Sequence, residues 1–311
     1  MKKRFINLAA VTSVNSKRLV CASLCLILCL NIASAQVKLS FNPGPNAKYE
    51  YLSESVQNIK QSVMGQEMPM EMEMNATYLM EVKNKTPQEI NTQMTYQGFT
   101  FSVSSPMMNI KYDSKKPIDN PSEMGKMIER MFSAIIDKSF TMVVAPNGSV
   151  KSVSGMGAII ESMLSAISAD GQAAAQMAAQ MSQQFSDENI KNMLGQSFFV
   201  YPDDAIKVGD SWNMENTMSI NNINFGIKAR NTLREVNSNM ATIAVAGDID
   251  LDMGEGKLTG TQTGSTIVDT VTGLPVTSDV SINMKGNINT QGMDVQVEMI
   301  SKTKTSVKEI K

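Results

Sequence analysis

Apolar side chains at every second position are the strongest structural signal in this 311-residue chain. The alternation is strict at the start of Met68 to Val82, where four methionines face one way and proline, two glutamates and asparagine face the other. Successive side chains of a β-strand point to opposite faces, so this pattern predicts a half-buried strand with a methionine face. Neighbouring segments with short turns between them are typical of an antiparallel meander.

The strand-like segments form two blocks, with a region of helical periodicity between them. We expect strands over 49–64, 68–82, 90–96 and 99–112 in the first block, and over 223–236, 240–253, 257–271, 276–285 and 293–310 in the second. Between the blocks, apolar residues at helical spacing predict amphipathic helices over 124–136, 156–167, 174–185 and 186–194. A hairpin over 140–153, turned by Pro146-Asn147-Gly148, separates the first two.

These segments predict an α+β fold. We expect a curved, half-barrel-like antiparallel β-sheet with an inserted cluster of three to four amphipathic helices, whose Met and Ile faces pack on the concave side. The expected organisation is a signal peptide (1–35) followed by one mature β-rich domain (36–311). Within it, 36–119 is a first β-meander, 120–195 a helical lid with a β-hairpin, and 196–311 a second β-meander.

Residues 1–35 have the features of a cleavable secretory signal peptide. Five basic residues precede an apolar run of about a dozen residues, shorter than the roughly 20 of a membrane span. Ala33 and Ala35 then supply the small residues that signal peptidase reads. A lipoprotein signal fits less well, because Cys21, Cys25 and Cys29 each follow a large apolar residue. We expect export to the periplasm or the medium, with an uncleaved anchor as the alternative, and no transmembrane segment in the mature chain.

Composition narrows the chemistry available to the mature chain. It has no histidine, and all three cysteines lie in the signal peptide, so most nucleophilic triads and zinc sites are excluded. We therefore expect no enzyme, no cofactor and no metal, although a carboxylate-dependent hydrolase stays open. Five of the 28 Lys and Arg residues and none of the 30 Asp and Glu residues lie in the signal, which leaves a net charge of −7. That charge argues against nucleic acid as a partner.

Three segments invite a more specific interpretation. Asp248-Ile249-Asp250-Leu251-Asp252 resembles the start of a calcium loop, but Met253 and Thr259 stand where glycine and glutamate are needed, so we expect a strand with a wet aspartate face. The methionine alternation could bind Cu(I), although histidine and cysteine are missing beside it. Asp203, Asp204 and Asp210 near Trp212 fit turn chemistry around a core tryptophan better than a sugar-binding edge.

Several stretches resemble a known family. These are Lys48-Tyr49-Glu50-Tyr51, the run Phe140 to Gly148, and Val268-Asp269-Thr270-Val271-Thr272-Gly273-Leu274-Pro275. They are similar to a domain-of-unknown-function family of uncharacterised secreted proteins from Gram-negative bacteria, which implies no activity. More distantly, the architecture resembles periplasmic lipid carriers of the LolA and LppX type, which implies that a curved sheet holds acyl chains under a helical lid.

We therefore expect a cell-envelope protein that binds or carries a hydrophobic small molecule, such as a lipid or acyl chain, in a methionine-lined groove. The candidate groove residues are Met70, Met72, Met74, Met127, Met131, Ile135, Ile160, Met163, Met177 and Met181. The alternative is a non-catalytic structural or interaction module of the envelope, in which the same apolar faces close against one another.

Overall fold

The computed structural model describes residues 36–63, 65–116, 122–168, 200–220, 223–290 and 292–310, together with Gln176 and Lys191. Residues Val37–Lys311 form one compact unit. Its strands are β1 (Lys48–Val63), β2 (Gln66–Lys85), β3 (Ile90–Ser105), β4 (Met108–Asp113), β5 (Ser139–Val144), β6 (Val150–Ser154), β7 (Ser211–Ile220), β8 (Ile223–Asn237), β9 (Met240–Asp252), β10 (Gly256–Asp269), β11 (Pro275–Thr290) and β12 (Met293–Ile310). Its helices are α2 (Glu123–Ser133) and α3 (Met156–Ser168).

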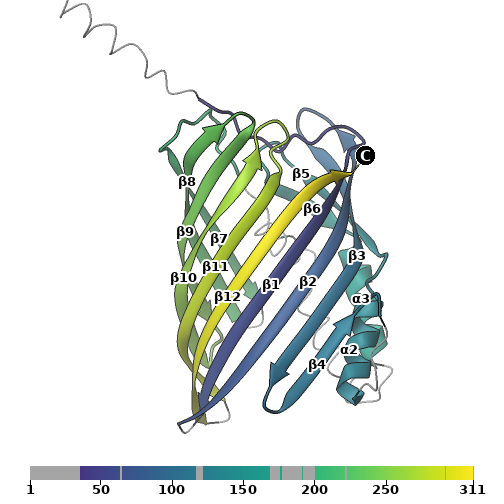
Figure 1. The fold of residues 1–311 in the computed structure, drawn as a ribbon, viewed down its shortest axis with the longest axis vertical. Coiled ribbons are helices and arrows are strands. Elements are labelled where there is room, and N and C mark those ends of the chain that lie inside the picture. Colours follow the sequence, from purple (N-terminus) through teal and green to yellow (C-terminus); the bar gives the residue numbers. More distant parts are fainter. Residues whose placement is uncertain are drawn as a thin grey trace, which may run out of the picture. The chain divides into compact units, whose positions relative to one another are not determined.

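All twelve strands belong to one sheet. Their order is β6-β5-β3-β2-β1-β12-β11-β10-β9-β8-β7, and β4 pairs with β3 beside this path. Every pairing is antiparallel, and β1 lies between β2 and β12 along its whole length. The two strand blocks expected from the sequence are therefore halves of one sheet, joined where the first strand pairs with the last (Figure 1).

The expected α+β class is wrong, because the unit is mostly β with two helices in its described part. The predicted helices over 124–136 and 156–167 correspond to α2 and α3, whereas those over 174–185 and 186–194 lie outside the described residues except for Gln176 and Lys191. The error has a physical cause. Periodicity indicates which segments form helices. It does not indicate how strands pair, and most of this fold comes from pairing between strands that are far apart in sequence, above all β1 and β12.

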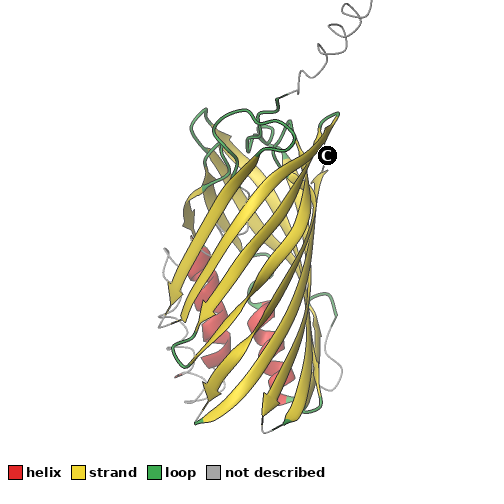
Figure 2. Ribbon diagram, turned by 90° about the vertical axis from the view of Figure 1, so that its left-hand side faces the viewer, coloured by secondary structure: helices red, strands yellow, loops and turns green. Residues whose placement is uncertain are grey.

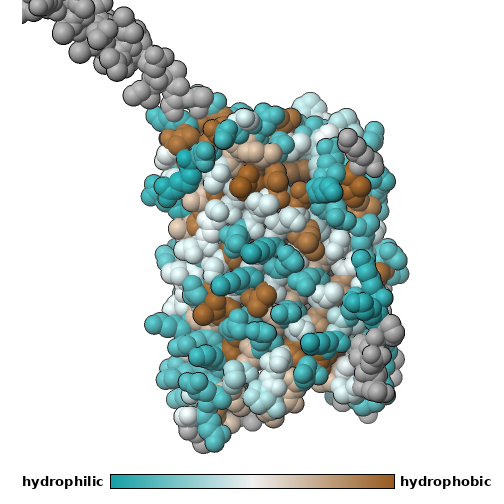
Figure 3. Space-filling view, viewed as in Figure 1, coloured by the Kyte–Doolittle hydropathy of each residue, from teal (hydrophilic) through white to brown (hydrophobic). Residues whose placement is uncertain are grey.

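The sheet coils, so that strands from opposite ends of its order approach each other (Figures 1 and 2). We call its concave side the inner face; it carries Tyr51 of β1 and Tyr78 of β2, which lie opposite one another. The outer face is mainly hydrophilic with separate apolar patches on the side seen in Figure 3. On β12, for example, Lys302, Lys304 and Lys308 are exposed.

Glycines on the inner face let neighbouring strands approach closely. A Cβ at Gly260 of β10 would meet the carbonyl oxygen of Asn283 and lie 2.7 Å from the Cα of Met284. A Cβ at Gly286 of β11 would meet the carbonyl oxygen of Lys257 and lie 2.9 Å from the Cα of Leu258. No ordinary Cβ fits such spaces, so these positions require glycine where β10 and β11 bend into the coil.

One end of the coil is closed by four loop segments, 37–47, 145–149, 201–210 and 269–275, which we call the closing segments. Backbone hydrogen bonds join them in pairs: Phe41 N–H donates to Pro146 O (2.7 Å), and Asn42 N–H donates to Thr272 O (2.7 Å). Tyr201 N–H donates to Asn147 O (2.8 Å), and the Tyr201 hydroxyl donates to Gly273 O (2.8 Å). These bonds hold the β5–β6 turn, the β10–β11 turn and the chain before β7 together.

The helices pack on the inner face of β3, β4 and β5. Ser122 caps α2, since its hydroxyl accepts a hydrogen bond from Gly125 N–H (3.1 Å). Phe132 at the other end of α2 lies against three rings of the sheet, with centroid distances of 4.2 Å to Phe99, 5.4 Å to Phe101 and 5.7 Å to Tyr112. Met156 and Ile159 of α3 are buried with residues of β5. The helices thus cover one side of the coil's interior.

Candidate functional site: an uncharged cavity on the inner face

A cavity of about 580 Å³ lies on the inner face. Its lining comes from strands of both halves of the sheet, so that Met142 of β5 and Met214 of β7 border the same space. The lining residues are Phe41, Tyr51, Ser53, Tyr78, Met94, Tyr96, Phe140, Met142, Tyr201, Met214, Phe225, Ile227, Asn231, Val245, Gln262, Gly273, Leu274, Pro275, Ser278, Val280, Ile282, Thr303 and Thr305. The volume is that of a small-molecule site, which typically measures about 300–1,000 Å³.

The cavity lies between two apolar clusters of the interior. One cluster contains residues of β1, β2, β3 and β5 together with residues of the helices, and it includes Met94 and Phe140. The other includes Ile249, Leu258 and Met284, with Phe225 packed against it. Each cluster contributes side chains to the cavity wall, so most of the lining is aliphatic, thioether or aromatic. Such walls accept apolar ligands of varied shape.

Between the two clusters, six polar side chains face the cavity. This polar belt consists of Ser53, Asn231, Gln262, Ser278, Thr303 and Thr305. Two of these side chains have hydrogen-bond partners within the protein: Ser278 hydrogen-bonds Thr266 (2.8 Å), and Thr303 donates to Ser55 (3.3 Å). Among the described residues that line the cavity, no Asp, Glu, Lys or Arg is present.

Three lining residues carry buried polar atoms without a hydrogen-bond partner. They are the Tyr51 hydroxyl, both amide atoms of Asn231, and Oε1 of Gln262. Asn231 is fully buried. A buried polar group with no partner costs about 1–3 kcal/mol, so native proteins keep few of them. Four of the five such atoms found among the described residues line this cavity, which makes it the candidate site.

Burial raises the pKa of several tyrosines that line the cavity. Burial raises the pKa of the Tyr51 phenol well above its ordinary value, and the neighbouring Tyr201 and Tyr49 raise it further. Burial likewise raises the pKa of Tyr78 and of Tyr201. At physiological pH these groups are neutral hydroxyls that can donate or accept a hydrogen bond, and they bring no charge to the cavity.

Of the predicted groove residues that the structure describes, three lie on the inner face of β2, and five lie on α2, on α3 or in the turn after α2, beside the cavity rather than around it. Met70, Met72 and Met74 share the inner face of β2 and are half-buried, and Met74 packs against the cluster formed by Ala76, Phe99 and Tyr112. These three methionines therefore share one half-buried face of β2, on the concave side of the sheet.

Ile135, in the turn after α2, is buried, and Ile160 and Met163 of α3 pack against the cluster that contains Ile135. Met127 and Met131 are half-buried on α2. Met177 and Met181 lie outside the described residues. None of the eight predicted residues that the structure describes is among those that line the cavity. The cavity methionines are Met94, Met142 and Met214 instead.

The polar belt was missed, although a signal for it exists in the sequence. On β1 every second residue from Tyr49 to Ile59 faces inward, and the three in the middle are Ser53, Ser55 and Gln57. β12 repeats this pattern, with Ser301, Thr303 and Thr305 between apolar ends of its inward-facing side. Polar residues in the middle of a buried face would have indicated a site, had the two strands been known to be neighbours.

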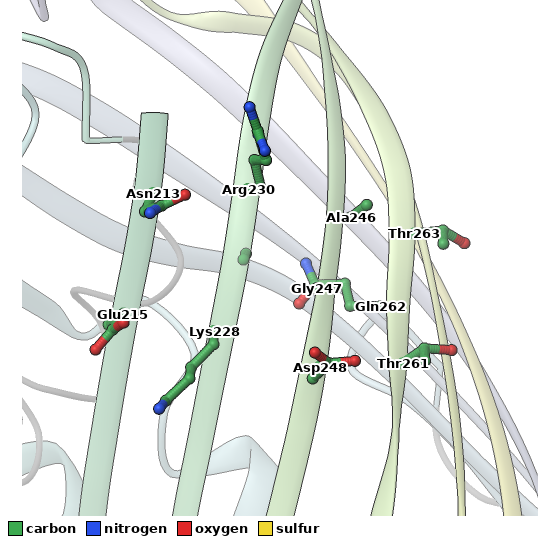
Figure 4. Close-up of a pocket in the computed structure, with 11 residues that line it drawn as sticks. Asn213, Glu215, Lys228, Arg230, Ala246, Gly247, Asp248, Thr261, Gln262 and Thr263 are labelled. Carbon is green, nitrogen blue, oxygen red and sulfur yellow. The ribbon is translucent and has the colours of Figure 1, made fainter. Parts of the chain in front are cut away.

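A second, polar hollow of about 480 Å³ lies on β7 to β10 (Figure 4). Lys228 of β8 pairs with Glu215 of β7 and with Asp248 of β9 in the register of the sheet, so the three charged residues stand side by side across neighbouring strands. Alternating charges on adjacent strands are ordinary for a solvated sheet surface. These carboxylates do not converge on a common point, so the hollow does not offer the paired acids of a hydrolase.

The remaining sequence motifs have structural explanations. Asp248, Asp250 and Asp252 are exposed while Ile249 is buried, as expected for a strand with a wet face. Trp212 packs into a core cluster and donates a hydrogen bond from Nε1 to Val200 O (2.9 Å). Throughout the described ranges, no group of three or more Asp, Glu, His or Cys side chains is arranged to hold a metal ion. In those same ranges, none of the helices combines the length and the apolar character needed to span a membrane.

Fold and cavity together define a mostly β protein whose coiled sheet surrounds an uncharged internal site. The chain belongs to DUF6263, a family of unknown function, whose model matches residues 87–275. The comparison with curated proteins gives no significant match.

Among solved structures, the chain is similar to a lipovitellin described for its lipid–protein interactions, with 8% identity and a TM-score of 0.44 over 85% of this chain and 25% of that one. It is also similar to OccK5 (OpdH) of Pseudomonas aeruginosa, with 6% identity and a TM-score of 0.22 over 86% and 99%. For an outer membrane channel of Pseudomonas putida F1, identity is 8% and the TM-score 0.20 over 86% and 98%. The chain spans about a quarter of the lipovitellin chain. These scores are too low to support an argument about function.

Proposed function

We propose that this protein binds a hydrophobic small molecule, such as a lipid or acyl chain, in the cavity on its inner face. One observation carries the proposal: a cavity of about 580 Å³ with a largely apolar lining remains between two well-packed clusters. An apolar space of this size is costly unless something fills it, because its walls lose contacts that close packing would give. The mode of binding would resemble that of LolA and LppX carriers, in which a curved sheet holds the chain on its concave side.

The proposal is of a binding protein rather than an enzyme. General acid–base catalysis needs titratable groups within reach of the substrate, and the described lining offers only tyrosine hydroxyls whose pKa burial has raised. A non-catalytic scaffold without a ligand is the competing function, and the experiment below separates the two.

The first test is extraction of ligands from natively purified protein, followed by mass spectrometry. A stoichiometric hydrophobic compound in the extract is the expected result. The second test fills the cavity. Val280→Phe adds a ring on the lining side of β11 and should weaken binding of an uncharged fluorescent probe, N-phenyl-1-naphthylamine, at least tenfold, which corresponds to about 1.4 kcal/mol.

Thr277→Phe is the matched control, because Thr277 is exposed on the outer face of the same strand. It should leave probe affinity unchanged. Both variants need a wild-type circular dichroism spectrum for the comparison to count. An empty extract, together with probe binding that Val280→Phe does not alter, would leave an unliganded scaffold as the better description.

We also propose export, on the basis of the basic start, the apolar run and the Ala33-x-Ala35 pattern of residues 1–35. Expression of the full chain in a Gram-negative host, followed by intact-mass measurement of the periplasmic fraction, tests this. The expected mass is that of a chain beginning at Gln36. Full-length protein retained with the membrane fraction would favour the uncleaved anchor.

A further inference from the structure

The unpartnered atoms around the cavity describe the chemistry of the group they would bind. Asn231 contributes both a donor and an acceptor, because neither Nδ2 nor Oδ1 has a partner. This conclusion does not depend on which way the amide is placed, since exchanging the two atoms leaves one donor and one acceptor. Gln262 contributes the acceptor Oε1, and Tyr51 a hydroxyl that can do either.

These groups line one cavity and come from three strands, none of which pairs with another of the three: β1 for Tyr51, β8 for Asn231 and β10 for Gln262. Their own strand neighbours do not satisfy them. Asn231, for instance, faces Trp212 on β7 and Val245 on β9, and Gln262 faces Gly247 on β9 and Ile282 on β11. A molecule in the cavity is therefore the remaining source of hydrogen bonds for them other than water.

The same lining argues against a charged ligand group. An ionised carboxylate or phosphate taken into a buried site needs a cation or several donors to offset its loss of hydration. The described lining has no lysine or arginine, and two of the unpartnered atoms, Asn231 Oδ1 and Gln262 Oε1, are acceptors that would repel an anion. An unsubstituted amide can donate to both of these oxygens and accept from Asn231 Nδ2, and a hydroxyl can donate to one of them and accept from Nδ2.

We infer that the ligand is an uncharged amphiphile, an apolar chain that ends in a hydroxyl or an unsubstituted amide, and that Asn231, Gln262 and Tyr51 bind this polar end. The apolar part lies against Met94, Met142, Phe225 and their neighbours. The inference rests on the proposed function, because it specifies what the same cavity accepts.

Displacement of N-phenyl-1-naphthylamine from the wild-type protein at pH 8 tests the inference with four ligands of equal chain length: 1-dodecanol, dodecanamide, dodecane and sodium laurate. Dodecanol and dodecanamide should displace the probe at concentrations at least tenfold lower than dodecane and laurate. In Asn231→Leu and Gln262→Met the advantage over dodecane should shrink to threefold or less, while affinity for dodecane itself is kept or improved. Thr263→Met, an exposed outer-face neighbour of Gln262, is the control that should keep the wild-type order.

The outcomes separate this inference from the proposed function. Equal displacement by dodecanol and dodecane in the wild-type protein would overturn the polar-end assignment and leave an unselective apolar site. Preference for laurate at pH 8 would overturn the claim of an uncharged ligand. Absence of probe binding to wild-type protein would instead overturn the proposed function itself. The ligand series is measured on wild-type protein, so the first two results do not depend on whether a variant folds.

Discussion

Asn231 shows most directly how single residues of this protein depart from the needs of stability. Its side chain is fully buried on the inner face of β8, with leucine, valine and isoleucine close by in the pairing register, yet neither amide atom has a hydrogen-bond partner. An aliphatic residue there would avoid the cost of burying the amide. On the function proposed above, this residue lowers the stability of the ligand-free protein and serves binding instead.

Asn231→Leu should therefore stabilise the ligand-free protein. Leucine has a similar volume and no polar atom to bury, so the free energy of unfolding should rise by about 1–2 kcal/mol. Urea denaturation followed by circular dichroism measures this. Ala244→Leu, on the outer face of β9, is a control that should change stability by less than about 0.5 kcal/mol. A loss of stability in Asn231→Leu would mean that the amide is satisfied in solution.

The buried tyrosines predict how stability depends on alkaline pH. Because burial raises the pKa of Tyr51, Tyr78 and Tyr201, the folded protein keeps protons that the unfolded chain releases above pH of about 10. The stabilisation is therefore complete below that pH and falls as the pH rises further, by about 1.4 kcal/mol per unit for each tyrosine.

Absorbance of tyrosinate at 295 nm should accordingly rise together with the loss of circular dichroism signal, and not before it. Tyr51→Phe removes one of these ionisable groups, so the free energy of unfolding should fall less steeply with pH, by about 1.4 kcal/mol per pH unit. Titration of all six tyrosines in a still-folded protein would contradict the burial described above.

Among the elements, β10 and β11 each depend on a glycine that faces the neighbouring strand. Gly260 and Gly286 lie where the two strands come so close that a Cβ would meet the neighbouring backbone. In a flat strand, glycine would only lower the stability of the folded protein, by about 0.5–1 kcal/mol relative to alanine. Their presence on the inner face is thus a local requirement of the coil, which the alternating pattern alone does not reveal.

Gly260→Ala should destabilise the protein by about 1–3 kcal/mol, because the added methyl group forces β10 away from β11. Gly226→Ala in β8 is the matched control, since nothing lies within 4 Å of the Cβ it would add, and it should be neutral or slightly stabilising. Thermal unfolding of the two variants makes the comparison. Equal melting temperatures would mean that the strands part without cost.

The local elements were largely predictable, and their assembly was not. Period-two alternation identified nearly every strand, as in 293–310 for β12, and helical spacing identified α2 and α3. The Asp248–Asp252 face and the Trp212 anchor also follow from local pattern. What escaped prediction depends on pairs far apart in sequence: β1 with β12, and Tyr51 and Asn231 on one cavity. Periodicity tells which side of a strand is buried, but it does not tell which strands share that side.

For the unit as a whole, the pairing of β1 with β12 is the connection between the two halves of the sheet. Sixteen residue pairs, from Lys48–Ile310 to Val63–Val295, connect the two halves. Neither half can keep its inner face buried without the other, because the cavity and the closing segments draw residues from both. We therefore expect one cooperative unfolding transition.

Lys302→Pro tests this connection. Lys302 lies in the middle of β12, opposite Val56 of β1 and Ser281 of β11, where proline removes a hydrogen bond of the ladder. The cost should reach about 3 kcal/mol, with both halves unfolding together in urea. Lys302→Ala, which removes only an exposed side chain, should change stability by less than about 0.5 kcal/mol. Two separate transitions in Lys302→Pro would show that the halves fold independently.

The order of the sheet begins with β6 and ends with β7, and in the described residues these two strands do not pair with each other. Loop hydrogen bonds of the closing segments, not a continuous ladder, hold the ends of the coil in place. As far as the described strands go, the sheet therefore has two margins, β6 and β7. A change in the distance between these two margins would therefore strain the loop hydrogen bonds of the closing segments first, and would leave the ladders between paired strands intact.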